Sequence, residues 1–107
     1  MTKTYRQGDV LLVAVAAIPE EAKDRVPRVN ARFILAEGEA TGHAHVVKSR
    51  EATLFRDPKF NRIFLRVTGQ GVALEHDEHT PVALAPGSYE VVRQREYSPE
   101  EIRRVAD

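Results

Sequence analysis

The sequence predicts a small all-β domain, an antiparallel barrel or sandwich with a short C-terminal helical tail. Apolar residues alternate or run together over short stretches, which is typical of strands rather than helices. Gly and Pro turn signals separate these stretches at close intervals. A chain of 107 residues is long enough for one domain with a modest core, so we expect a single β-rich domain over 1–107.

The first half of the chain is expected to form strands with one helical interruption. Residues 8–15 begin with a Gly-Asp turn and continue as an apolar run, which indicates a central strand covered on both sides. The charged segment 19–25 begins with Pro and is expected to form one or two helical turns before Pro27 ends it. Further extended segments are predicted at 32–36, 46–48 and 52–55.

The second half contains the clearest alternation. After a turn at 57–61, Ile63, Leu65 and Val67 share one face of a strand and two Arg occupy the other. Val72, Leu74 and His76 then share the core face of the next strand, which draws His76 toward the interior or its rim. An extended segment at 80–84, a Pro-Gly turn at 85–88 and a final strand at 89–94 complete the predicted sheet.

The two ends of the chain carry different signals. Ser98, Pro99 and Glu101 match a capping box with Pro at the first helical position, which predicts the helical tail. Residues 1–6 are polar and no apolar run is long enough for a membrane span, so we expect no signal peptide, no membrane partner and a cytoplasmic location.

Composition limits the classes of partner and of metal site. Sixteen basic and sixteen acidic residues cancel, which argues against a general electrostatic attraction to nucleic acid. A small molecule, a protein partner and a second copy of the chain all stay open. The absence of cysteine excludes disulfides and thiolate ligands, so any metal must be held by nitrogen and oxygen donors.

All four histidines lie in two short clusters, Thr41-Gly42-His43-Ala44-His45 and His76-Asp77-Glu78-His79. A His-x-His pair on a strand places both rings on one face, because side chains alternate with a period of two. A spacing of three brings His76 and His79 together on a helical turn or a tight loop but not on a regular strand. We therefore expect a turn or bulge at Asp77-Glu78.

Paired imidazoles from two parts of the chain are suited to metal binding. We expect one divalent ion, with zinc favoured over iron, nickel or copper, and with His43, His45, His76 and His79 as its ligands. Glu39 shares the parity of the His-x-His pair and Glu78 lies inside the second cluster, so both are candidate catalytic carboxylates. Three nitrogen ligands with an open position would favour a metal-dependent hydrolase or oxygenase, whereas a fourth histidine would close the site.

Two resemblances accompany this pattern. Gly38 ahead of His43-Ala44-His45, with Pro86-Gly87 later, partly resembles the motifs of cupins, which are jelly-roll metal proteins. In cupins a glutamate follows shortly after the His-x-His pair, and the last histidine follows the Pro-x-Gly turn. This chain departs from that pattern, because Glu51 lies slightly too late for the glutamate and because His76 and His79 precede Pro86-Gly87. The sequence is also similar to small uncharacterised bacterial and phage proteins with paired TGHAH and HDEH motifs, which implies only that the two clusters belong together.

Two other functions remain open. The first is metal-free acid and base catalysis on a phosphodiester or RNA by one histidine of each cluster, with an arginine on the phosphate. Candidate arginines are Arg62, Arg66, Arg93 and Arg95. The second is a non-enzymatic β-module, an assembly or accessory protein, in which the histidines are structural or lie at an interface.

Overall fold

The computed structural model describes residues 3–37 and 43–93, and this part of the chain consists of strands, turns and loops. The all-β prediction is therefore confirmed, while the predicted helical tail lies outside the described residues. No described segment is a helix that could cross a membrane. The strands are β1 (Thr4–Gln7), β2 (Val10–Val15), β3 (Asp24–Arg25), β4 (Phe33–Glu37), β5 (Ala44–Val47), β6 (Ala52–Asp57), β7 (Arg62–Val67), β8 (Val72–His76), β9 (His79–Leu84) and β10 (Gly87–Arg93).

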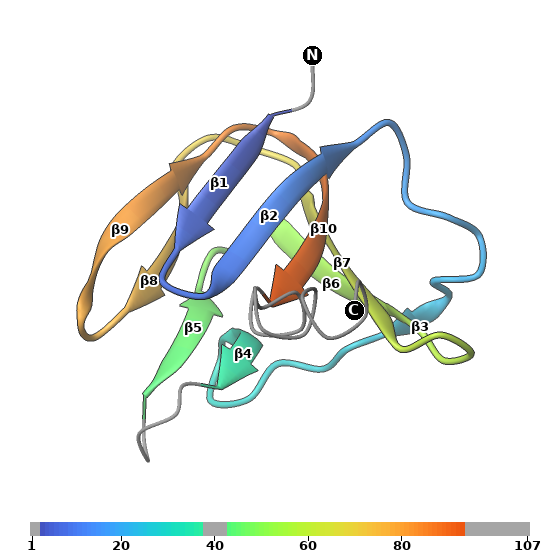
Figure 1. The fold of residues 1–107 in the computed structure, drawn as a ribbon, viewed down its shortest axis with the longest axis horizontal. Helices are drawn as coiled ribbons and strands as arrows, with labels where there is room; N and C mark the ends of the chain where they lie inside the picture. Colours follow the sequence, from blue (N-terminus) through green and yellow to red (C-terminus); the bar gives the residue numbers. More distant parts are fainter. Residues whose placement is uncertain (1–2, 38–42, 94–107) are drawn as a thin grey trace, which may run out of the picture.

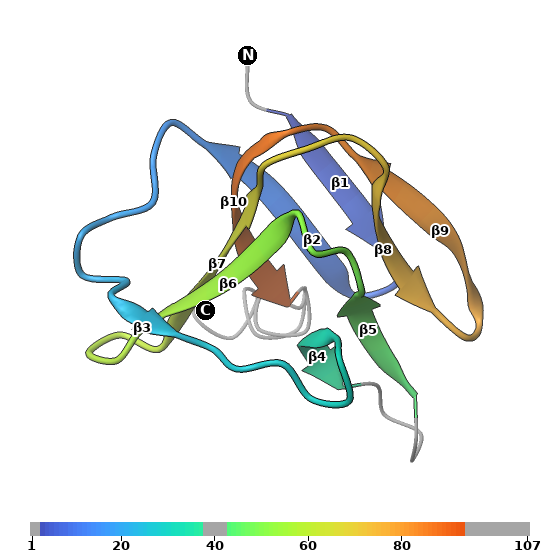
Figure 2. The ribbon, with the colours of Figure 1, turned by 180° about the vertical axis from the view of Figure 1, so that it is seen from behind.

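The strands form two antiparallel sheets with the core between them. The six-stranded sheet has the order β1-β2-β10-β7-β6-β3, and the four-stranded sheet has the order β4-β5-β8-β9. Strand β1 at the edge of the larger sheet lies beside β9 at the edge of the smaller one (Figures 1 and 2). The turn between β1 and β2 therefore lies near the β8–β9 hairpin and near β5.

Alternation along the strands explains the core. Leu12 on β2, Leu65 on β7 and Leu74 on β8 are fully buried and belong to one apolar cluster contributed by both sheets. Charged residues on the opposite strand face are exposed, as for Arg66 beside Leu65, although Phe64 on that face is buried as well. The predicted core faces of β7 and β8 are thus confirmed.

Two predictions about the first half of the chain fail. The expected helical turns at 19–25 are absent: the Ala22 amide donates to the Pro19 carbonyl at 3.0 Å in a single turn, and Asp24–Arg25 then pairs with β6. Within this charged segment only Ala22 is buried, so a helix here would have no apolar face to pack. The second error is an omission, because the polar run that forms β1 was not predicted as a strand.

A buried glutamine joins the two sheets. The side chain of Gln7, at the end of β1, is 3% exposed. Its Nε2 donates to the carbonyl of Leu74 on β8 at 2.9 Å and to the carbonyl of Thr80 on β9 at 3.0 Å. An uncompensated buried amide would destabilise the fold, so these bonds fix how β1 meets the β8–β9 hairpin.

Truncation of a core residue should separate packing from surface effects. We expect Leu65→Ala to lower the free energy of unfolding by about 2–5 kcal/mol, because Leu65 is fully buried and the cavity left behind would collapse only partly. Phe60→Ala is the control, since Phe60 is 66% exposed, and should change the free energy by less than about 0.5 kcal/mol. Urea unfolding followed by circular dichroism measures both; equal losses would contradict the assigned core.

Candidate functional site

The structure brings the four histidines together at the junction of the two sheets. His43 precedes β5 and His45 lies within it, while His76 ends β8 and His79 begins β9. The ring centroids of His45 and His76 are 4.4 Å apart, and those of His76 and His79 are 4.7 Å apart. The His45–His79 and His43–His76 centroids lie at 5.8 and 5.9 Å. The expected turn at 77–78 is confirmed, with a register shift between Leu74 and His76.

His45 is the buried member of the cluster, with 2% exposure. Its Nδ1 lies 3.0 Å from Gln7 Oε1. Because the Gln7 amide nitrogen already donates to two carbonyls, Oε1 faces the ring and can only accept. His45 therefore donates from Nδ1, and in the neutral ring Nε2 presents its lone pair on the other side. This is how an outer hydrogen bond fixes the tautomer of a metal-binding histidine.

A carboxylate that the sequence did not single out faces this lone pair. Asp9 Oδ1, in the turn between β1 and β2, lies 3.4 Å from His45 Nε2. Its other oxygen, Oδ2, accepts from Arg93 Nη2 at 3.1 Å, and the same nitrogen donates to the Glu37 carbonyl at 2.9 Å. The Gly-Asp dipeptide was interpreted as a turn only, because nothing in the local sequence indicates that this turn packs against β5.

The electrostatics follow from burial and from these neighbours. Burial lowers the pKa of His45 from its ordinary value, and nearby His76 acts in the same direction, while Asp9 opposes the shift. For Asp9, burial acts to raise the pKa, but the Arg93 guanidinium, a backbone hydrogen bond and nearby His45 together lower it, and the net direction is downward. A neutral imidazole and an ionised carboxylate are the protonation states that ligate metals.

Asp77 and Glu78 of the second cluster lie close to His43 of the first. The Glu78 amide donates to His76 Nδ1 at 3.0 Å, which holds the hairpin turn. Asp77 Oδ2 and Glu78 Oε1 lie 3.6 and 4.0 Å from His43 Nδ1, a buried atom without a hydrogen-bond partner among the described residues. Both carboxylates are largely exposed, which puts them at the rim of the cluster. Glu78 therefore lies at this rim, beside His43.

The cluster is not a preformed metal cage. Over residues 3–37 and 43–93, no three His, Asp or Glu side chains are arranged to hold an ion together. One reason is visible at His76, where Nδ1 is occupied by the Glu78 amide. Glu39, the other predicted catalytic carboxylate, lies outside the described residues.

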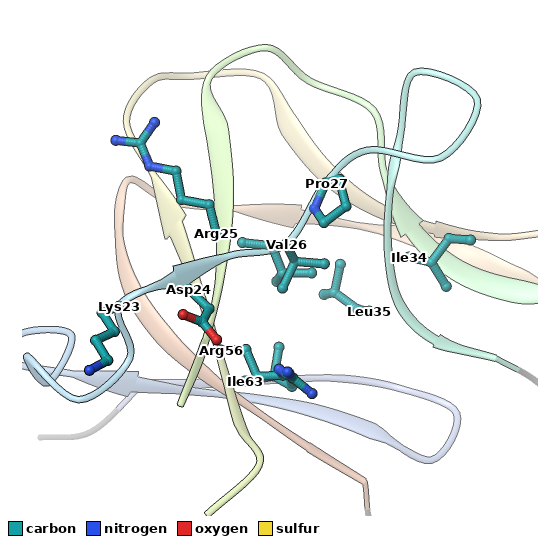
Figure 3. A pocket seen from close by; sticks show the side chains of 10 residues that line it. Lys23, Asp24, Arg25, Val26, Pro27, Ile34, Leu35, Arg56 and Ile63 are labelled. Atoms are coloured by element: carbon teal, nitrogen blue, oxygen red, sulfur yellow. The ribbon is translucent and has the colours of Figure 1, made fainter. Parts of the chain in front are cut away.

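An open pocket lies apart from the histidines (Figure 3). Its volume is about 630 Å³, and the apolar side chains of Val26, Leu35 and Ile63 lie among charged ones that include Arg56. Leu35 and Leu54 of its lining belong to the core cluster, so the pocket is an open end of the space between the sheets. It contains no histidine and is separate from the candidate site.

The fold and the cluster define the class of protein: a two-sheet antiparallel β domain with grouped histidines where the sheets meet. A family model described as a domain of unknown function, DUF8820, matches residues 6–94, and the chain belongs to this family. That match assigns no activity and does not confirm the cupin-like resemblance. Comparison with curated proteins and with solved structures gave no match.

Gly8 has no side chain, and this leaves room for the two histidine clusters to meet. Its φ is +60°, and a Cβ at this position would lie 2.8 Å from His79 Nε2 and 3.3 Å from His45 Cε1. Gly8→Ala should lower the free energy of unfolding by about 1–2 kcal/mol through its left-handed backbone and should also displace the His79 ring.

Gly71→Ala is the matched control. Gly71 has a φ of +77°, but a Cβ there would meet nothing within 4 Å. Gly71→Ala should show a similar decrease in the free energy of unfolding, measured in urea, without a change in the NMR signals of the histidine rings. Unchanged His79 signals in Gly8→Ala would contradict the described approach of Gly8 to His79.

Proposed function

We propose that this protein binds one divalent metal ion, with zinc favoured, through the cluster of His43, His45, His76 and His79. The observation that supports the proposal best is the oriented imidazole of His45. Gln7 fixes its tautomer, so the Nε2 lone pair faces Asp9, and the ring centroids of His76 and His79 lie 4.4 and 5.8 Å from that of His45. Outer hydrogen bonds of this kind orient metal ligands and strengthen their binding.

Binding requires rearrangement of the partly exposed rings. His45 is held by Gln7, whereas His79 is exposed and His43 is partly exposed. Rotation of these two side chains toward His45 Nε2 is the least costly way to complete a coordination shell. His76 joins it through Nδ1 only by giving up the hydrogen bond from the Glu78 amide.

The exposed edge of the cluster favours a site with an exchangeable position. The histidines there would hold an ion without enclosing it, and a zinc ion so held would supply activated water for hydrolysis. Glu78 at the rim would then serve as the proton acceptor, with its side chain 65% exposed and free to reorient. Hydrolysis is the reaction class that we propose for the site.

The phosphodiester alternative receives less support. Arg62 forms two hydrogen bonds to Glu90 and Arg66 lies over the Phe55 ring, so both are engaged on the larger sheet. Arg93 is close to the histidines, but it is bound to Asp9. Arg95 lies outside the described residues.

Metal titration of the full chain tests the proposal. After chelator treatment, calorimetry with Zn²⁺ should show one equivalent bound, and the Tm should rise because only the folded state is liganded. A His43→Ala/His79→Ala variant should bind at least about tenfold more weakly through loss of ligands. His45→Ala should bind no measurable zinc; circular dichroism must show that it folds.

Glu75→Gln is the control for removal of a nearby group. Glu75 pairs with Lys48 through an ion pair of 3.7 Å outside the cluster, so its loss should leave zinc affinity unchanged. If the native chain shows no saturable binding of Zn²⁺, Fe²⁺, Ni²⁺ or Cu²⁺, the proposal fails. The histidines would then be structural, as in a non-enzymatic β-module.

A further inference from the structure

We propose that Asp9 is an oxygen ligand of the metal site, which makes it a mixed nitrogen and oxygen centre rather than an all-histidine one. This inference rests on the proposed metal binding and adds a residue that lies outside both histidine clusters. Asp9 comes from the β1–β2 turn of the larger sheet, whereas His45 comes from β5 of the smaller one. An ion held by both would therefore connect the two sheets.

The separation between the two donors fits a shared ion. Asp9 Oδ1 and His45 Nε2 are 3.4 Å apart. Two ligands at about 2.0–2.2 Å from one tetrahedral zinc ion lie about 3.3–3.6 Å from each other. The same distance is long for a direct N–H···O hydrogen bond, which is usually about 2.7–3.2 Å.

The hydrogen bonds around the pair also point to a cation. Nδ1 of His45 holds the ring proton for Gln7 Oε1, so Nε2 of the neutral ring is an acceptor. The Asp9 carboxylate is an acceptor as well. Two acceptors facing each other repel unless a proton or a cation lies between them. A divalent ion satisfies both and leaves the Gln7 bond intact.

Each donor has a partner on its far side. Arg93 holds Asp9 Oδ2 and is itself bound to the Glu37 carbonyl, which limits the rotation of the carboxylate. Gln7 holds His45 in the same way. These outer contacts resemble the support that ligating carboxylates and histidines receive in metal sites. Carboxylate plus imidazole favours Zn²⁺ or Fe²⁺ over Cu⁺, which prefers sulfur ligands.

Two substitutions at position 9 test the ligand role. Asp9→Asn keeps the shape of the side chain and an oxygen that can accept from Arg93, but it removes the charge. Its Zn²⁺ affinity should fall by about 10- to 100-fold relative to the native chain. Asp9→Cys, loaded with Co²⁺, should show a thiolate-to-cobalt charge-transfer band in the near ultraviolet, a signature that appears only if residue 9 contacts the ion.

Controls separate this inference from the proposed function. Glu75→Gln and Glu75→Cys change a carboxylate that pairs with Lys48 at 3.7 Å outside the cluster, and they should leave the affinity unchanged and give no such band. If the native chain binds zinc but Asp9→Asn binds equally well, or Co²⁺-bound Asp9→Cys lacks the band, Asp9 is not a ligand and the histidine site stands alone. Absence of metal binding by the native chain would overturn both.

Discussion

The buried side chain of Gln7 is the constraint on which the meeting of the two sheets depends. Its amide lies in an interior position, where each unpaired polar atom would cost about 1–3 kcal/mol. The two carbonyls that it contacts belong to β8 and β9, and the ring that it contacts belongs to β5. Since all three contacts form only in one arrangement of β1 against the smaller sheet, Gln7 couples the architecture to the orientation of His45.

The same junction explains why the polar groups gather where they do. The faces between the sheets are filled almost entirely by apolar residues. At the β1–β9 edge the core ends, and a turn containing Gly8 approaches the histidines without a Cβ. Charged partners such as Arg93 and Asp77 can then remain partly hydrated while His45 is buried. A site at this position combines fixed inner groups with movable outer ones.

Secondary structure could be predicted from the local sequence where one periodic pattern of apolar residues dominated. The prediction failed where the segment had no such pattern. Strands β7 and β8 were predictable because alternating apolar residues bury one face. The polar strand β1 has no such alternation, and it exists because its backbone pairs with β2 along all four residues. The charged segment 19–25 carried helix-start signals, but with only Ala22 buried it had no packing surface to stabilise a helix.

The sequence by itself determined the all-β class, the tight turn inside the second histidine cluster and the donor types open to any metal. These properties follow from composition and from periodicity over neighbouring residues. Only the tertiary structure decided which segments meet: it placed Asp9 opposite His45, Gln7 behind it and Glu78 beside His43. Such contacts join residues far apart in the chain, and they depend on sheet order and register, which local periodicity does not encode.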